Sequence, residues 1–178
     1  MKLDKKRKLE KKTDYKQRLI LLKSKTPRFI VRKTNKYLIM QIVESDKAQD
    51  TVKLGIITKD LIKYGWPEDK SGSLKSLTAS YLGGYLIGKK LEKDNSVILD
   101  MGLNPNTKGS RIYAAVKGLS DAGIKINYGK EIVPSEKMIE GKNKDILTKV
   151  KKNIEQNLAL SPKVQKKTKG LKDIENGK

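Results

Sequence analysis

Two neighbouring segments in the first third of the chain give its clearest structural signal. Residues 28–33 (Arg-Phe-Ile-Val-Arg-Lys) and 37–43 (Tyr-Leu-Ile-Met-Gln-Ile-Val) are rich in β-branched and aromatic residues, as strands are. The polar tripeptide 34–36 between them is short enough to form a hairpin turn. A third strand over about 50–57 would extend the hairpin into an antiparallel meander. The apolar run 96–100 predicts a short buried strand.

Apolar residues at helical spacing predict helices around these strands. The expected helices span about 13–24, 58–64, 73–92, 110–123 and 143–158. Thr13 or Asp14, Thr58 and Ser110 are suitable N-caps for three of them. Gly84 and Gly88 lie one turn apart, and each costs about 1 kcal/mol relative to alanine inside a helix. We therefore expect these glycines to permit close packing against the sheet.

The order of the elements predicts an α/β fold. It consists of a mixed, partly antiparallel sheet with helices packed on it, a basic N-terminal arm and a C-terminal helical extension. Residues 1–12 are almost all charged and lack an apolar face, so we expect them to be disordered until bound. We divide the chain into the arm (1–12), an α/β domain (13–142) and a C-terminal helix with a basic tail (143–178).

The charge of the chain indicates the class of its partner. Lys and Arg number 41 against 20 Asp and Glu, a formal net charge of +21 over 178 residues. Residues 1–25 carry eleven basic and three acidic side chains, and residues 159–178 carry six and two. Such a surplus opposes folding by self-repulsion, but it suits a polyanion that releases counterions on binding. A basic body with two basic arms predicts a nucleic-acid-binding protein.

The composition also argues against several other classes of protein. The chain has no cysteine and no histidine, which removes disulfides, thiolate metal sites and the usual general base. The composition argues against metal-dependent or histidine-based catalysis but does not exclude carboxylate chemistry, and we expect no cofactor, no metal site and no small-molecule substrate. The apolar runs are too short to span a bilayer, and no secretory signal is visible. We therefore expect a cytoplasmic protein without a membrane partner.

The first candidate site is the arm with the helix that follows it. Its cationic and aromatic residues are Lys5, Lys6, Arg7, Lys8, Lys11, Lys12, Tyr15, Arg18 and Lys23. Such a segment would lie along a phosphate backbone and become ordered on contact. A solvated tail that aids solubility is the alternative for a charge run alone, and the second basic arm makes nucleic acid the favoured interpretation.

Two further segments carry cations in positions suited to binding phosphate. The hairpin carries Arg28, Arg32, Lys33, Asn35, Lys36 and Tyr37. Its arginines could bind phosphate oxygens in a forked fashion and its tyrosine could stack on a base, unless the charges merely protect an exposed sheet edge. The loop before the fourth helix carries Lys108, Ser110 and Arg111 at a helix N-terminus, where anions bind. Ordinary capping by Ser110 is the alternative.

Asp100 ends the buried strand and is the best candidate for an enzymatic alternative. With Asp121 and Glu44 it could hold Mg²⁺ for phosphodiester hydrolysis, as in a nuclease. Because no known spacing brings these acids together, a hydrogen-bonding role for Asp100 is favoured. Trp66, the single tryptophan, is expected to anchor in the core.

Several blocks of the sequence resemble one family. They are Lys12-Thr13-Asp14-Tyr15, the run from Pro27 to Tyr37, Lys63-Tyr64-Gly65-Trp66, the run from Tyr81 to Lys90, that from Ile98 to Leu103, and that from Gly109 to Gly123. In this order, over roughly residues 5–142, the blocks resemble archaeal-type large-subunit ribosomal protein eighteen. This family includes the eukaryotic protein that carries 5S ribosomal RNA.

The resemblance implies a protein that performs no catalysis and clamps 5S rRNA into the central protuberance of the large ribosomal subunit. Its expected partners are 5S rRNA, the large-subunit rRNA and neighbouring ribosomal proteins. The arm, the hairpin turn and the loop at residues 108–111 are the RNA contacts that the resemblance implies. Without it, a nonspecific RNA chaperone remains a further alternative. Residues 126–129 read Ile-Asn-Tyr-Gly where the family pattern has Ile-Pro-His-Gly.

Overall fold

The computed structural model describes residues 6–46, 49–91 and 96–160. In chain order the elements are α1 (Lys6–Leu9), α2 (Tyr15–Lys23), β1 (Arg28–Lys33), β2 (Leu38–Asp46), β3 (Gln49–Ile57), η1 (Thr58–Tyr64), η2 (Glu68–Ser73), α3 (Leu77–Lys90), β4 (Ser96–Asp100), α4 (Arg111–Asp121), β5 (Lys125–Ile126), η3 (Lys130–Ile132), α5 (Glu136–Glu140), η4 (Gly141–Asn143) and α6 (Lys144–Leu160). The η elements are 3₁₀ helices.

The strands form one mixed sheet in the order β3-β2-β1-β4-β5. The β1–β2 and β2–β3 pairs are antiparallel, as the alternating sequence predicts, whereas β4 runs parallel to β1. The predicted mixed α/β architecture is thereby confirmed. The sequence pattern did not reveal β5, because a strand of two residues has no period to detect.

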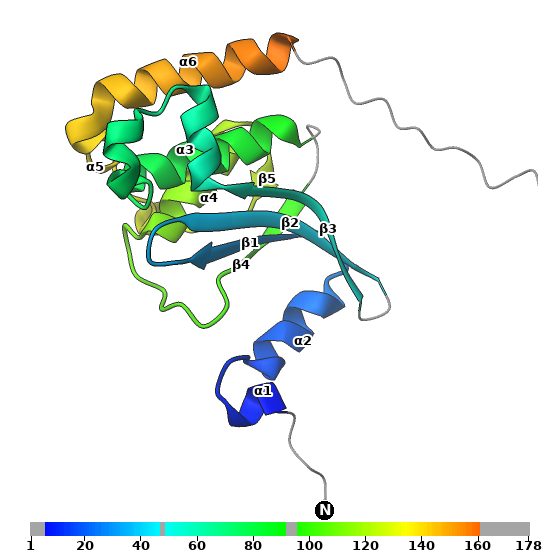
Figure 1. Cartoon of the computed structure of the whole chain (residues 1–178). Coiled ribbons are helices and arrows are strands. Elements are labelled where there is room, and N and C mark those ends of the chain that lie inside the picture. Colours follow the sequence, from blue (N-terminus) through cyan, green and yellow to red (C-terminus); the bar gives the residue numbers. More distant parts are fainter. Residues whose placement is uncertain (1–5, 47–48, 92–95, 161–178) are drawn as a thin grey trace, which may run out of the picture.

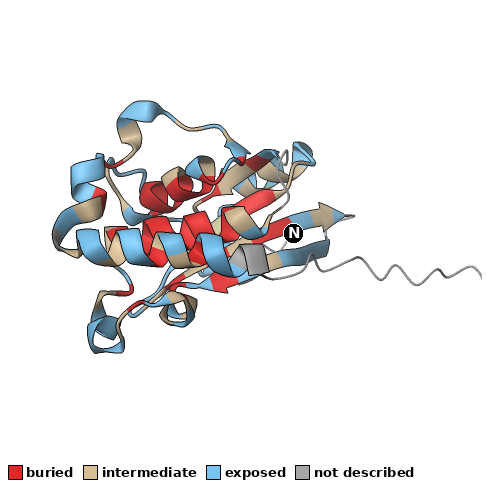
Figure 2. Cartoon of the chain, turned by 90° about the horizontal axis from the view of Figure 1, so that it is seen from above, coloured by how far each residue is buried: buried red, intermediate tan, exposed pale blue. Residues whose placement is uncertain are grey.

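Helices cover one face of the sheet, and the arm lies against the other (Figure 1). Phe29 and Val31 of β1 are fully buried and belong to one apolar cluster with residues of α3, α4 and α6. Buried residues gather in the middle of the molecule, with exposed residues around them (Figure 2). The single tryptophan, Trp66, is 2% exposed in this cluster and donates from Nε1 to the Lys70 carbonyl at 3.2 Å, which confirms its anchoring role.

The two longest helices of the central layer, α3 and α4, cross through glycines. A Cβ added to Gly84 would lie 2.0 Å from the Ala115 carbonyl oxygen, and one added to Gly118 would lie 2.0 Å from that of Tyr81. A Cβ on Gly88 would lie 2.6 Å from the Ala122 Cβ. The expectation that Gly84 and Gly88 pack against the sheet was therefore wrong, because their partner is a helix.

Helix α6 closes the core from the far side of α3. Val150 and Ile154 are fully buried, as the predicted apolar spacing requires. Asn153 donates from Nδ2 to the Tyr64 carbonyl at 2.9 Å, and the Tyr85 hydroxyl donates to Glu155 Oε1 at 2.5 Å. The helix is thus fixed to both α3 and η1.

Several boundaries differ from the predicted ones for local reasons. Helix α3 begins at Leu77 and not near residue 73, because the Ser76 hydroxyl accepts from the Ala79 N–H and residues 68–73 form a 3₁₀ turn. Thr58 caps no helix. Its hydroxyl accepts from the Leu38 N–H at 3.1 Å, whereas the Asp60 carboxylate accepts from the N–H of Ile57.

The arm differs from expectation in part. Residues 6–9, expected to be disordered until bound, form one helical turn, and the Arg7 Nε donates to the Thr13 hydroxyl at 3.1 Å. Helix α2 follows as predicted, with Asp14 as its N-cap. Lys5 and the basic tail beyond residue 160 lie outside the described residues.

The glycine crossing leads to a first prediction. Gly84→Ala should lower the free energy of unfolding by about 3 kcal/mol or more, because the new methyl must force α3 and α4 apart. Urea unfolding followed by circular dichroism measures the change. Gly72→Ala is the matched control: its Cβ would meet nothing within 4 Å, and stability should change by less than about 0.5 kcal/mol. Equal stabilities of the two variants would contradict the crossing.

Candidate nucleic-acid interface

Two of the predicted cationic segments leave the sheet at the same edge. Strands β1 and β4 run parallel, so the hairpin turn after β1 and the loop after β4 both begin at the carboxyl ends of these strands (Figure 1). Lys33, Asn35 and Lys36 in the turn are exposed, as are Lys108 and Arg111 at the end of the loop. The turn and the start of the loop therefore lie at the same end of the sheet, although they are far apart in the chain.

Internal hydrogen bonds fix the hairpin turn. The Thr34 N–H donates to the Tyr37 carbonyl at 2.9 Å, and the Tyr37 N–H donates to the Thr34 hydroxyl at 2.9 Å. Tyr37 itself is half-buried, and its side chain packs against the core cluster. The lysines therefore project from a rigid turn, while Tyr37 offers less of its ring to a partner than an exposed tyrosine would.

The start of α4 leaves polar groups available. Gly109 has φ of +67°, and Ser110 is the N-cap residue. The Ser110 hydroxyl does not cap the helix: it is buried and has no hydrogen-bond partner among the described residues. The alternative of ordinary side-chain capping is therefore not observed. Arg111 begins the helix, where the free N–H groups carry partial positive charge.

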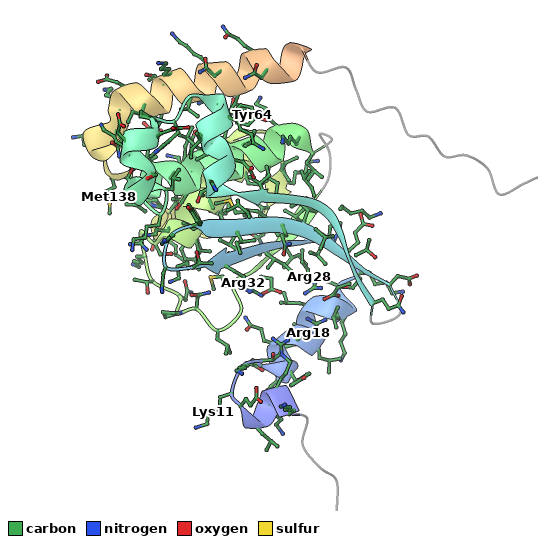
Figure 3. All side chains as sticks on the ribbon, viewed as in Figure 1. Lys11, Arg18, Arg28, Arg32, Tyr64 and Met138 are labelled. Carbon is green, nitrogen blue, oxygen red and sulfur yellow. The ribbon has the colours of Figure 1, made fainter. Side chains whose placement is uncertain are left out.

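The arm lies beside this edge, on the open face of the sheet. Arg18 of α2 forms an ion pair with Asp50 of β3, with 2.8 Å between Nη2 and Oδ2. A cleft of about 370 Å³ separates the arm and α2 from Arg32 and from residues 102–104 of the loop. Figure 3 shows Arg18 and Arg32 between α2 and the sheet. The cleft thus brings together the arm, α2, Arg32 of β1 and the start of the loop that leads to Lys108 and Arg111.

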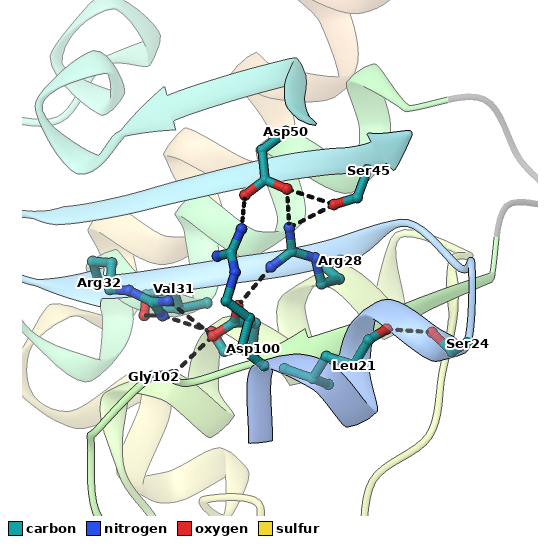
Figure 4. A network of polar contacts seen from close by, with 10 residues as sticks. Leu21, Ser24, Arg28, Val31, Arg32, Ser45, Asp50, Asp100 and Gly102 are labelled. Atoms are coloured by element: carbon teal, nitrogen blue, oxygen red, sulfur yellow. Dashed lines mark hydrogen bonds and ion pairs between the residues drawn. The ribbon is translucent and has the colours of Figure 1, made fainter. Parts of the chain in front are cut away.

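A chain of charged groups connects α2 to the sheet beneath it (Figure 4). Arg28 donates to Asp50 Oδ1 and to the Ser45 hydroxyl, both at 2.8 Å, and to Asp100 Oδ2 at 3.1 Å. Its side chain is only 2% exposed. The prediction that Arg28 contacts RNA was therefore wrong, because burial and two carboxylate partners remove it from the surface.

Arg32 is also bound to Asp100 but stays half-exposed. Its Nη2 lies 2.8 Å from Asp100 Oδ1, and its Nη1 donates to the Asp100 carbonyl at 2.8 Å. The side chain is 40% exposed and lines the cleft. Arg28 and Arg32 lie four positions apart and share one face of β1, yet only Arg32 reaches the surface.

Asp100 has the hydrogen-bonding role that was favoured for it. Beyond the two arginines, its Oδ1 accepts from the Gly102 N–H at 2.9 Å. Asp121 accepts from the Tyr81 hydroxyl, and Glu44 pairs with Lys53, so these acids have separate partners. Within the described ranges, no three acidic side chains are grouped in a way that could hold a metal ion. Nothing in this geometry supports the nuclease alternative.

Asp50 has a strongly perturbed acidity. Burial by itself raises the pKa of its carboxyl, but hydrogen bonds from Ser45, Arg18 and Arg28 outweigh this effect and lower the pKa to about 2. The carboxylate is therefore ionised across the whole range in which ribonucleoproteins are studied. It keeps both arginines in place over that range.

The remaining predicted site residues lie at the surface to different degrees. Those on the exposed surface are Lys6, Arg7, Lys8, Lys11, Lys12, Lys23, Lys33, Asn35, Lys36, Lys108 and Arg111, and those of intermediate exposure are Tyr15, Arg18, Arg32, Tyr37 and Ser110. Lys12 pairs with Glu10 at 2.8 Å. All of these residues remain candidates for contact with RNA.

Sequence reasoning missed Asp50, one of the two acids that organise the basic surface. Asp50 was treated as the start of a strand, although β2–β3 pairing sets it directly opposite Ser45. The signal was present: Arg28 alternates with core residues in β1, and a buried arginine needs a carboxylate partner. Which acid supplies it depends on the strand register, and the sequence alone does not determine that register.

Comparison with known proteins gives independent evidence of the family to which the chain belongs. The chain matches the family described as ribosomal large subunit proteins 60S L5 and 50S L18, over residues 1–97 and 89–129. It is 46% identical to the large ribosomal subunit protein uL18 of Korarchaeum cryptofilum over 139 residues, which are 77% of this chain and 69% of that protein. The proteins of the same name from Methanoregula boonei and Methanococcoides burtonii are each 39% identical over 77% of this chain and 78% of their own length.

None of the helices among the described residues is long and apolar enough to cross a membrane.

The shifted pKa of Asp50 gives a second prediction. Because its pKa is lowered from 3.8 to about 2, its contribution to stability is complete above pH 4 and is lost as the pH falls toward 2. The partly exposed site reduces this contribution by solvent screening to about 1 kcal/mol. Acid titration of the unfolding free energy should show the loss in the natural protein and not in Asp50→Asn. Glu44→Gln, which alters an exposed pair with Lys53, is the control and should retain it.

Proposed function

Because the chain belongs to the family of ribosomal large-subunit proteins 60S L5 and 50S L18, we propose that it binds 5S rRNA and helps to anchor it in the central protuberance of the large subunit. A structural role in the large ribosomal subunit follows from family membership. The proposal adds three points: 5S rRNA as the RNA partner, the central protuberance as the position in the ribosome, and the cytoplasm as the location.

The observation that carries the proposal is the cleft in which the arm and α2 face Arg32 and residues 102–104, at the end of the sheet from which the hairpin turn and the loop extend. Phosphates of a folded RNA present negative charge over a comparable surface, and neutralising them releases counterions. The cations project from a hydrogen-bonded turn and a helix start, so their spacing is set before RNA arrives. Such a surface suits recognition of RNA shape more than of base sequence.

Large-subunit rRNA and neighbouring ribosomal proteins are the other partners that we propose. Basic side chains also lie away from the described edge, for example Lys89 and Lys151, whose ammonium groups lie 5.2 Å and 5.0 Å from the centre of the Tyr85 ring. A protein that joins two RNA molecules needs cations on more than one face, and this chain has them.

A nonspecific RNA chaperone would also use positive charge, and a competition experiment separates it from the proposal. We predict that unlabelled 5S rRNA displaces labelled 5S rRNA from the full chain at least about tenfold better than a length-matched RNA or duplex DNA does. If about six phosphates are neutralised, the logarithm of the binding constant should fall with the logarithm of salt at a slope of about −4 to −5. Equal displacement by all three competitors would favour the chaperone.

The arm should contribute affinity without contributing to the fold. We predict that replacing Lys5, Lys6, Arg7 and Lys8 together by Ala weakens binding to 5S rRNA by about tenfold or more at low salt, because four phosphate partners are lost. The melting temperature should stay unchanged, since residues 6–8 are exposed.

A matched variant removes the same charge elsewhere. Lys125, Lys130, Lys137 and Lys149 are all exposed and lie outside the arm, the turn and the loop. Their joint replacement by Ala should weaken binding much less than the arm variant does. Equal effects of the two variants would mean that net charge, and not the arm, determines affinity.

A further inference from the structure

Three arginines from three segments of the chain line one cleft. Arg7 comes from the arm, Arg18 from α2 and Arg32 from β1. Each guanidinium is held by an oxygen of the protein: Thr13 Oγ1 at 3.1 Å, Asp50 Oδ2 at 2.8 Å and Asp100 Oδ1 at 2.8 Å, respectively. Their positions are therefore fixed before any ligand enters.

These bonds leave most of the arginine N–H groups free. A guanidinium carries five N–H donors. Counting only bonds between described residues, Arg7 and Arg18 each make one, which leaves four donors, and Arg32 makes three, which leaves two. An acceptor-rich anion that enters the shared cleft can therefore accept from several guanidiniums at once.

The acids near the cleft do not compete for this role. Asp14 Oδ1 accepts from the backbone N–H groups of Lys16 and Gln17, so it serves as the N-cap of α2. Asp100 accepts from Arg28, Arg32 and the Gly102 N–H. The cleft lining includes four cations, the three arginines and Lys12, against these two acids, a balance of +2. The acids hold donors in position, and the balance still favours an anion.

We propose that this cleft binds one internucleotide phosphate of RNA, with Arg7, Arg18 and Arg32 as its donors and Thr13, Asp50 and Asp100 as positioning residues. The volume of about 370 Å³ suits a phosphate with its attached ribose. Guanidinium matches phosphate by paired N–H bonds, which an ammonium group does not reproduce. This inference rests on the proposed function, since it assigns part of the RNA-binding surface a specific ligand.

Charge-preserving substitutions test the donors. Arg7→Lys, Arg18→Lys and Arg32→Lys keep the net charge but remove the forked donor, so each should weaken binding of the full chain to 5S rRNA by about five- to tenfold. Lys125→Arg is the control. It also exchanges one cation for another at constant charge, at an exposed position outside the arm, the turn, the loop and the cleft, and affinity should change less than about twofold.

Substituting the positioning residues tests whether they strengthen or weaken RNA binding. Asp100→Asn makes the protein more positive, so electrostatic attraction alone predicts tighter RNA binding. The proposal predicts weaker binding, by about fivefold or more, because Arg32 loses its carboxylate partner. Thr13→Val provides a second test at the half-buried end of the arm, where it removes the oxygen that holds Arg7 and leaves the core untouched.

A single neutral linkage in the RNA separates loss of the clamp from loss of the fold. Scanning 5S rRNA with one methylphosphonate at a time should reveal a position at which the natural protein loses about tenfold in affinity. Arg32→Lys and Asp100→Asn should lose little more at that position, because their clamp is already impaired. A variant that was only less stable would keep the tenfold loss at that position, because its remaining folded molecules still contain the clamp.

The possible failures are distinct. If the natural protein does not prefer 5S rRNA, the proposed function is wrong. If it prefers 5S rRNA but Arg32→Lys binds as tightly as Lys125→Arg, or Asp100→Asn and Thr13→Val bind as tightly as the natural protein, the phosphate clamp is wrong and the proposed function stands.

Discussion

The ion pairs of Asp100 are the interaction on which the basic side of this protein depends. Asp100 is 6% exposed, and its carboxylate joins the end of β4 to Arg28 and Arg32 of β1. Removing one partner from such a buried pair typically costs about 3–5 kcal/mol, because a charge remains without a partner. The same carboxylate also orders the first turn of the loop through the Gly102 N–H. One acid therefore fixes a sheet junction, a surface arginine and the start of a loop.

On a surface that binds a polyanion, the neighbouring cationic side chains repel one another. This chain reduces the repulsion by inserting Asp50 and Asp100 between arginines, so that neighbouring guanidiniums share a carboxylate. The cost in net charge is small compared with the surplus of +21. The gain is a set of cations whose spacing is fixed by hydrogen bonds. Acidic residues in a basic interface are thus part of its construction.

Much of this architecture could be predicted from the sequence, and the rest depended on pairing between distant segments. The alternation in residues 28–43 and the apolar spacing of α6 are local signals, and both elements were found where they were expected. The fate of Arg28 was mispredicted because burial depends on β2–β3 register and on the parallel placement of β4. Likewise, nothing local distinguishes a glycine that faces a sheet from Gly84, which faces the Ala115 carbonyl of another helix. Charge and expected geometry located the three cationic segments, and the family resemblance supported them, whereas the ion-pair network emerged from the coordinates.

The position of α6 has a consequence for how the chain folds during synthesis. Val150 and Ile154 are fully buried against elements that precede them by some 60 residues or more, so the apolar layer around α3 stays uncovered until this last helix has been made. A nascent chain that has emerged as far as β5 already contains every strand of the sheet, the turn and the arginine cluster, yet it still exposes apolar surface on the opposite side. The order of synthesis therefore completes the basic side before the helical side is covered.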